Sequence, residues 1–213
     1  MNMVIPAILE QDWEEIEKKI EVAQHFSNHL HIDFIDGVFA KNKTFMDPAA
    51  FSKYSKSNFL EAHLMVNDPV KYLEPLAAAG FKRFIGQIEM LPDQSDFVSK
   101  GEELGDVGLA IDGKTPIDKL LVALDDLDIL LFMAYDAGFS GQGFNPSYLE
   151  KIKSLGEVFV DIEVDGGITD KTILEAKNAG ANIFTANSFL FGSIDPKKNY
   201  FTLSDLVSET GKL

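Results

Sequence analysis

The chain contains no cysteine, so it can form no disulfide, and any metal site must be built from nitrogen and oxygen ligands. Long apolar runs are also missing, since no stretch approaches the roughly 20 residues that span a bilayer. The N-terminal MNMVIPAILEQD has neither the basic region nor the long apolar core of a secretory signal. These absences together predict a cytoplasmic protein.

Basic side chains are scarce: 19 Lys and Arg stand against 34 Asp and Glu, a net charge of −15. Nucleic acids and anionic membrane surfaces are held mainly by clustered Lys and Arg, so the sequence predicts neither kind of partner. A small phosphorylated substrate remains possible, because backbone N–H groups in glycine-rich loops and at helix N-termini bind phosphate without basic side chains.

What the chain does have is a series of eight short apolar stretches spread over its 213 residues. Their length and β-branched content are typical of parallel strands buried on both faces. Helical segments between them predict an alternating fold, and the count of eight favours a single (β/α)8 TIM barrel domain over residues 1–213. We expect strands at residues 3–9, 29–33, 59–65, 83–88, 107–111, 129–133, 159–164 and 183–186.

Capping residues predict where several helices begin and end. Asp12 precedes one helical segment, with Glu15 placed to complete a capping box. A capping residue before a proline marks three more helix starts, and a glycine supplies two left-handed stops. These positions are Asp68-Pro69, Thr115-Pro116 and Asn145-Pro146 for the starts, and Gly80 and Gly180 for the stops. The first strand is followed by PAILEQD, which has no glycine for a dinucleotide fingerprint, so an open nucleotide-binding sheet is disfavoured.

Four imidazole and carboxylate side chains lie at the ends of predicted strands: His31 and Asp33 in HIDFIDG, His63 in EAHLM and Asp165 in IEVDGG. In a parallel barrel these strand ends meet on one face, where catalytic residues collect. Two imidazoles and two carboxylates there predict a divalent metal site. Each alone has an ordinary alternative, either a buried His–Asp pair or a strand-to-loop turn.

Small and glycine residues follow the last three strands, where such barrels usually bind phosphate. We expect a phosphate group to be bound by Gly138, Phe139, Ser140, Gly141, Gly166, Gly167, Asn187 and Ser188. Simple turn chemistry is the alternative explanation of these glycines. Met65 and Met133 end two strands and form a wall of the same pocket if they face it, although core packing is the ordinary role of methionine.

With these motifs assembled, the chain resembles the ribulose-phosphate 3-epimerase family, through PAIL, HIDFIDGVF, AHLMVNDP, GFSGQGFNP, EVDGGI and ANSFLFG. The resemblance implies a metal-dependent barrel enzyme of the pentose phosphate pathway that interconverts D-ribulose 5-phosphate and D-xylulose 5-phosphate through an enediolate. It implies that His31, Asp33, His63 and Asp165 bind one Zn, Mn, Fe or Co ion, without an organic cofactor. Asp33 and Asp165 would also transfer the proton, and the protein would form a homo-oligomer.

The chain departs from the family pattern around this pocket. Ala7 replaces the usual serine, Gln87 replaces a histidine of the fourth strand, Asn187 replaces a glycine, and Ile35 replaces one of three methionines. None of these positions is among the four proposed ligands. The departures therefore bear on the identity of the substrate more than on the type of reaction.

Three alternatives remain. The same chemistry on another sugar, such as a hexulose 6-phosphate, would fit these departures. A non-catalytic phosphosugar-binding relative is the second, and metal content would separate it. A metal-independent decarboxylase or synthase of the orotidine-phosphate decarboxylase type is the third, but such enzymes use an Asp-x-Lys on a strand and position 35 is Ile.

Overall fold

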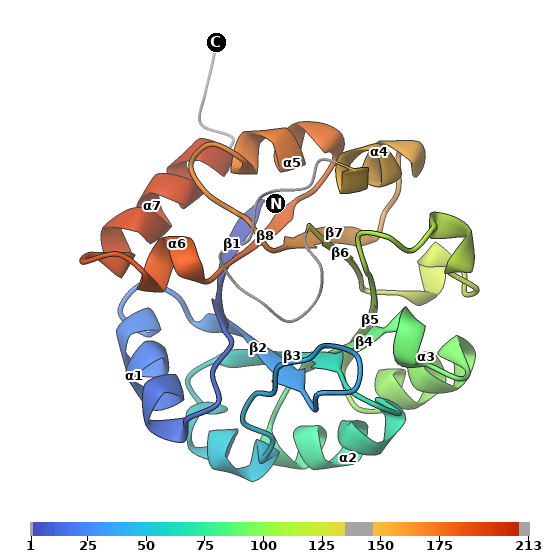
Figure 1. The fold of residues 1–213 in the computed structure, drawn as a ribbon, viewed down its shortest axis with the longest axis horizontal. Helices are drawn as coiled ribbons and strands as arrows, with labels where there is room; N and C mark the ends of the chain where they lie inside the picture. The colour runs from blue at the N-terminus through green and yellow to red at the C-terminus, as the bar shows by residue number, and fades with distance from the viewer. Residues whose placement is uncertain (1, 135–146, 209–213) are drawn as a thin grey trace.

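In a computed structural model, which describes residues 2–134 and 147–208, eight parallel strands close into a barrel in the order of the chain (Figure 1). The predicted (β/α)8 barrel is confirmed. Among the described residues no helix has the length and apolar character to cross a membrane. The strands are β1 Met3–Ile8, β2 His29–Ile35, β3 Phe59–Met65, β4 Arg83–Gln87, β5 Asp106–Ile111, β6 Ile129–Met133, β7 Asp161–Asp165 and β8 Ile183–Ala186.

The helices surround this barrel on its outside (Figure 1). They are α1 Trp13–Ala23, α2 Val70–Ala79, α3 Gln94–Glu102, α4 Ser147–Ser154, α5 Ile173–Ala179, α6 Ser188–Phe191 and α7 Pro196–Val207. Two connections depart from the predicted alternation. Between β2 and β3 the chain forms the 3₁₀ segment η1 Pro48–Tyr54, and between β5 and β6 the short turns η3 Ile117–Lys119 and η4 Leu124–Asp126. The expectation of a full helix after Thr115-Pro116 is therefore wrong.

The predicted cap of α1 is confirmed, because the Asp12 side chain accepts a hydrogen bond from the backbone N–H of Glu14. Glu15 instead pairs with Lys18 one turn further along, at 2.6 Å between Nζ and Oε1. A side-chain cap thus starts this helix, and the capping-box partner that the sequence suggested is used in an exposed ion pair.

Helix α2 shows both outcomes of the cap predictions. Asp68 lies in the left-handed region at φ 56°, and Pro69 takes the N-cap position without a side-chain hydrogen bond, so the predicted Asp68 cap is wrong. At the other end Gly80 adopts φ 93°, as expected for a left-handed stop. Gly180 ends α5 at φ 120°. The Asn145-Pro146 start lies outside the described residues.

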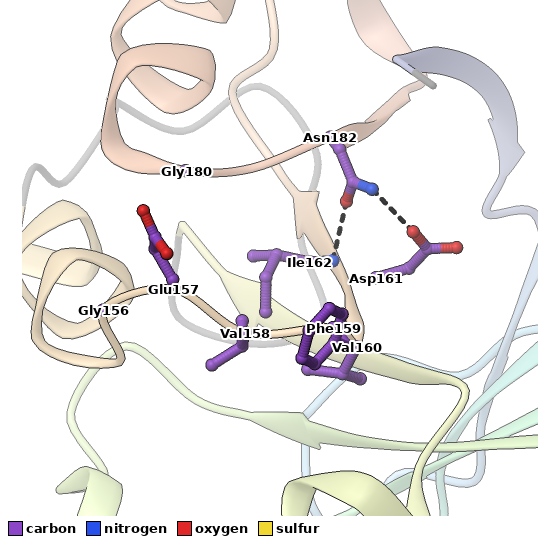
Figure 2. A pocket seen from close by; sticks show the side chains of 9 residues that line it. All are labelled: Gly156, Glu157, Val158, Phe159, Val160, Asp161, Ile162, Gly180 and Asn182. Atoms are coloured by element: carbon purple, nitrogen blue, oxygen red, sulfur yellow. Dashed lines mark hydrogen bonds between the residues drawn. The ribbon is translucent and has the colours of Figure 1, made fainter.

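Strand β7 begins two residues later than the sequence suggests, at Asp161 rather than Phe159. Phe159 is 102% exposed, so its apolar character does not mark a buried strand position. Asn182, just before β8, defines the start: its Oδ1 accepts from the backbone N–H of Ile162 at 2.7 Å, and its Nδ2 donates to Asp161 Oδ1 at 2.6 Å (Figure 2). The pocket drawn in Figure 2 therefore lies at the amino ends of β7 and β8, opposite the end of β7 that carries Asp165.

Side chains alternate between the inside of the barrel and the layer beneath the helices. On β2, Ile32 and Phe34 pack in the outer core with residues such as Phe51. Ile35 belongs to an inner cluster with Met65 and Met133. His31 and Asp33 have the same parity as Ile35 and are buried, so they project into the barrel, which confirms the face predicted for them.

Candidate metal centre

His31 and Asp33 lie within β2 and not at its end, because the strand continues to Ile35. The prediction that this pair closes the strand is wrong by two residues. Parallel pairing with β3 sets Asp33 opposite His63, and pairing with β1 sets His31 opposite Ala7. His63 also lies two residues before the end of its strand, so the candidate site is sunk into the barrel below its rim.

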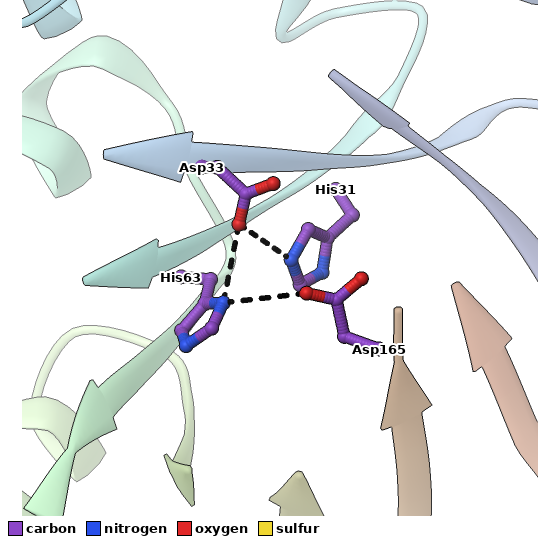
Figure 3. Close-up of side chains that lie close together, drawn as sticks. All are labelled: His31, Asp33, His63 and Asp165. Atoms are coloured by element: carbon purple, nitrogen blue, oxygen red, sulfur yellow. Dashed lines mark hydrogen bonds and ion pairs between the residues drawn. The ribbon is translucent and has the colours of Figure 1, made fainter. Parts of the chain in front are cut away.

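The structure brings together the four side chains that the sequence singled out. Each of His31, Asp33, His63 and Asp165 offers one nitrogen or oxygen atom, and these atoms lie within 4.8 Å of one another (Figure 3). Asp165 comes from β7, across the barrel from β2 and β3. The first three are buried, and Asp165, whose side chain is 16% exposed, is the member of the group with the most exposure to solvent.

Asp33 is at the centre of the group. Its Oδ1 lies 3.1 Å from His63 Nδ1 and 3.3 Å from His31 Nε2. Asp165 Oδ2 lies 4.0 Å from the same His63 Nδ1. One nitrogen of each imidazole and one oxygen of each carboxylate therefore face a common point, as ligands of a single cation do.

The other nitrogen of His31 is held from below by two glutamates. Nδ1 lies 2.7 Å from Glu61 Oε1 and 3.1 Å from Glu163 Oε1, and both glutamates are fully buried. Since carboxylate oxygens accept hydrogen bonds, Nδ1 carries the proton. The group formed by His31, Glu61 and Glu163 is thus accounted for by a hydrogen bond and needs no cation of its own.

This assignment provides a test of whether the residues fit a metal. With the proton on Nδ1, neutral His31 points the lone pair of its buried Nε2 at Asp33 Oδ1, and Nε2 makes no hydrogen bond of good geometry. Two electron-rich atoms at 3.3 Å require positive charge between them, either a second proton or a metal ion. The donor set of two imidazole nitrogens and two carboxylate oxygens suits Zn²⁺ and neighbouring divalent ions.

The two aspartates differ in how firmly they hold a proton. Burial raises the pKa of Asp33, but the neighbouring imidazoles of His31 and His63 outweigh it and bring the pKa to about 2. Burial and the negative charge of Asp33 raise the pKa of Asp165 to about 7. Near neutral pH one carboxylate is therefore charged while the other can hold a proton, the pattern of an acid and base pair.

Sequence reasoning missed the ionic layer beneath the site. Besides His31, Glu61 binds His29 Nε2 at 3.0 Å and Arg83 Nη1 at 3.1 Å through its second oxygen. Glu163 accepts a hydrogen bond from Thr185. The signal was present in the sequence, because Glu61 and Glu163 each lie two residues before a proposed ligand and so share its inward face.

The residues predicted to line the pocket are buried in the same region. Met65 and Met133 pack with Ile35 in the cluster inside the barrel, and Ala7 is 1% exposed. Gln87 is fully buried, and its Oε1 lies 2.9 Å from His63 Nε2. Three of these four buried side chains are apolar, and the amide of the fourth, Gln87, is directed at a histidine.

Of the residues predicted to bind phosphate, those after β7 and β8 are described. Gly166 and Gly167 adopt φ 98° and 65°, conformations that favour glycine. Asn187 precedes Ser188 at the start of α6, and its Oδ1 accepts from Lys19 Nζ at 3.1 Å. Gly138, Phe139, Ser140 and Gly141 lie outside the described residues.

Solved structures of similar shape establish the fold alone, since their sequences differ widely. The 3-keto-L-gulonate-6-phosphate decarboxylase from Vibrio cholerae has a TM-score of 0.72 and 15% identity, covering 97% of both chains. A 3-hexulose-6-phosphate synthase has a TM-score of 0.69 and 16% identity over 98% of this chain and 100% of the other. Orotidine 5'-phosphate decarboxylase from Pyrococcus horikoshii has a TM-score of 0.67 and 14% identity over 96% and 99%.

Sequence similarity is more specific. Ribulose-phosphate 3-epimerase of Schizosaccharomyces pombe is 32% identical, covering 92% of this chain and 89% of its own. The cytoplasmic isoform of Oryza sativa subsp. japonica is 34% identical over 91% and 89%, and the Bacillus subtilis enzyme 32% over 93% and 96%. The sequence profile of the ribulose-phosphate 3-epimerase family matches residues 3–191, and the chain belongs to this family.

Proposed function

We propose that the protein is a metal-dependent 3-epimerase that interconverts D-ribulose 5-phosphate and D-xylulose 5-phosphate. The observation that carries the proposal is the convergence of His31, Asp33, His63 and Asp165 from three strands, within 4.8 Å of one another. Relatives named ribulose-phosphate 3-epimerase, at 30–34% identity, support the substrate. The family is metal-dependent, and Zn²⁺, Mn²⁺, Fe²⁺ or Co²⁺ is the ion proposed here.

Asp33 and Asp165 are the proposed catalytic residues. Epimerisation beside a carbonyl removes a proton from one face of carbon 3 and returns a proton to the other. Asp33 and Asp165 project from strands on different sides of the barrel, so a sugar between them meets one carboxyl group on each face. In one direction ionised Asp33 accepts the proton and protonated Asp165 donates one, and in the reverse direction they exchange roles.

Positioned acid and base groups contribute about 10²–10⁴-fold each, which is too little for a weakly acidic carbon. A divalent ion held by the four ligands would act as a Lewis acid that offsets the negative charge of the enediolate. His31 and His63 direct one nitrogen each toward the position proposed for the ion. The apolar surfaces of Met65 and Met133 limit the access of water. Ala7 and Gln87 complete the proposed wall.

The phosphate of the substrate is proposed to bind Gly138, Phe139, Ser140, Gly141, Gly166, Gly167, Asn187 and Ser188. The positive φ angles of Gly166 and Gly167 support this by turning the backbone after β7 sharply. We also propose that residues 1–213 form one domain, that the protein is cytoplasmic and that it assembles as a homo-oligomer, which size-exclusion chromatography with light scattering tests.

The test of the function combines metal analysis with deuterium exchange. The purified protein is assayed in D₂O with D-ribulose 5-phosphate and, separately, a hexulose 6-phosphate. Deuterium at carbon 3 of the pentulose and a bound divalent ion support the proposal. Label only in the hexulose would change the substrate, and absence of both metal and label would leave a phosphosugar-binding protein.

Asp165→Asn tests the proposed proton transfer, because the amide keeps the shape of the side chain and removes the transferable proton. Turnover is expected to fall by about 10²–10⁴-fold, with circular dichroism and melting unchanged. Activity near the level of the unmodified protein would refute the two-aspartate mechanism.

A further inference from the structure

A chain of hydrogen bonds runs from the end of β5 to the metal site. The backbone N–H of Asp112 donates to Glu89 Oε1 at 3.0 Å. Gln87 Nε2 donates to Glu89 Oε2 at 2.7 Å, and Gln87 Oε1 lies 2.9 Å from His63 Nε2. The other nitrogen of His63 lies 3.1 Å from Asp33 Oδ1. The steps from Asp112 through Glu89 and Gln87 to His63 Nε2 each join one donor to one acceptor, so the direction of these hydrogen bonds can be worked out.

The polarity follows from the end at Glu89. A backbone N–H can only donate and an ionised carboxylate can only accept, so Glu89 is fixed as an acceptor on both of its oxygens. The amide NH₂ of Gln87 must therefore face Glu89, which leaves the amide oxygen of Gln87 facing His63. An amide oxygen can only accept, and so His63 Nε2 carries the proton.

The consequence is at the opposite nitrogen of the ring. With its proton on Nε2, neutral His63 presents the lone pair of Nδ1 to Asp33 and Asp165, as a metal ligand must. We propose that Gln87 is a positioning residue for metal binding, which fixes the tautomer and ring orientation of His63, and that Glu89 fixes the orientation of Gln87. This inference rests on the proposed metal site.

Because of burial, water is not available to accept the hydrogen bond from His63 Nε2 in place of the Gln87 amide oxygen. Gln87 is fully buried, as is His63, so a variant without the amide oxygen leaves the Nε2 proton without a partner in the apolar wall. The amide is also neutral, so it orients His63 without adding a third negative charge beside Asp33 and Asp165. The negative charge of Glu89 acts on His63 only through Gln87, from an exposed position after β4.

The experiment measures metal affinity, because a positioning residue changes it while a residue that only supports the fold does not. The apoprotein and its variants are titrated with Zn²⁺ in competition with a chromophoric chelator. Gln87→Met keeps the size of the side chain and removes the acceptor. Gln87→His is the rescue variant, since an imidazole can accept from His63 on one nitrogen and donate to Glu89 from the other.

The matched control is Gln94→Met. Gln94 is also buried, and it also bonds through both ends of its amide, to Lys119 O at 2.8 Å and from the backbone N–H of Leu121 at 2.8 Å. Its partners lie outside the group of four ligand candidates. Loss of Gln94 therefore reports the general effect of removing a buried amide.

We expect Gln87→Met to bind Zn²⁺ about 10–100-fold more weakly, with Gln87→His and Gln94→Met within about threefold of the unmodified protein. Activity of Gln87→Met should return when the Zn²⁺ concentration is raised, which separates weaker loading from a lost catalytic group. Equal Zn²⁺ affinity in Gln87→Met and the unmodified protein would overturn the role of Gln87 and leave the proposed function intact. An unmodified protein that binds no divalent ion would instead overturn the proposed metal site.

If Gln87→Met does not fold, Glu89→Ala tests the same proposal, because Glu89 is exposed and its replacement leaves the buried core unchanged. Its removal frees the Gln87 amide to rotate, and we expect weaker Zn²⁺ binding in the same direction as for Gln87→Met. Long-range ¹H–¹⁵N correlation spectra of the Zn²⁺-loaded protein give the tautomer directly. A proton on His63 Nε2 is expected, and a proton on Nδ1 would contradict the proposal.

Discussion

The buried carboxylate of Glu61 offers a direct test of how the barrel supports the site. Glu61 is fully buried and accepts from three side chains, His29, His31 and Arg83. Burial raises its pKa, but hydrogen bonds from the two histidines outweigh it and hold the pKa well below its usual range. Glu61→Gln keeps the shape of the side chain, removes its charge and turns an NH₂ group toward a donor.

The magnitude follows from what is left behind. Removing one partner of a buried ion pair costs about 3–5 kcal/mol, because the other charge stays buried. Arg83 keeps Asp106 at 3.1 Å, so we expect the lower end, about 3 kcal/mol. With a urea m-value of about 2 kcal/mol per molar, the unfolding midpoint should fall by about 1.5 M.

The assay is urea unfolding of the metal-free protein, followed by the fluorescence of Trp13, whose ring lies 5.0 Å from those of Phe45 and Phe51. Glu103→Gln, on the exposed surface, serves as control and should shift the free energy of unfolding by no more than about 0.5 kcal/mol. A midpoint for Glu61→Gln within about 0.3 M of the control would refute the argument that Glu61 is a fully desolvated ion-pair partner.

Three further outcomes follow from the structure. Burial lowers the pKa of His63, but the hydrogen bond of protonated His63 to Asp33 and the charge of Asp33 raise the pKa overall. A metal ion must displace the proton on Nδ1, so Zn²⁺ affinity in competition titrations should rise with pH through neutrality, by about tenfold per unit for each proton released. Lys151→Met removes the donor to three backbone carbonyls in the loop after β5 and should lower the melting temperature by about 2–8 °C in calorimetry. Gly108→Ala places a methyl group 2.6 Å from the carbonyl oxygen of Ile129 and should destabilise the protein by about 1–3 kcal/mol in urea unfolding, whereas an unchanged midpoint would mean that β5 and β6 can separate.

The strands were predictable because parallel strands are buried on both faces and read as continuous apolar runs. The first and last residues of the strands were harder to predict wherever an apolar residue is exposed or a charged residue belongs to the strand. Phe159 is apolar yet fully exposed, and its apolar character led to a predicted start of β7 that is two residues too early. Asp165 is charged yet is the last residue of β7, one position beyond the predicted end. Tertiary contacts decide these positions, since Asn182 fixes the start of β7.

The candidate site was predictable in its members but not in its surroundings. Alternation along a strand identifies the face of His31, Asp33, His63 and Asp165, and closure of the barrel brings the faces together. The level at which each side chain lies depends on the register between strands, which a single sequence does not reveal. For this reason the sequence could place Glu61 on the inward face of its strand, two residues before His63, but could reveal neither its contact with His31 nor the contact of Gln87 with His63.

The two imidazoles are held by opposite means, and this difference bears on what the barrel interior is for. His31 is oriented by the carboxylates of Glu61 and Glu163, whereas His63 is oriented by the neutral amide of Gln87. Buried charges are weak contributors to stability, and an apolar layer of equal volume would often be more stable. An apolar layer, however, has no acceptor for the Nδ1 proton of His31, and without one the ring is free to turn its lone pair away from the cation. The ionic layer is therefore better explained by the orientation of a proposed metal ligand than by the stability of the fold.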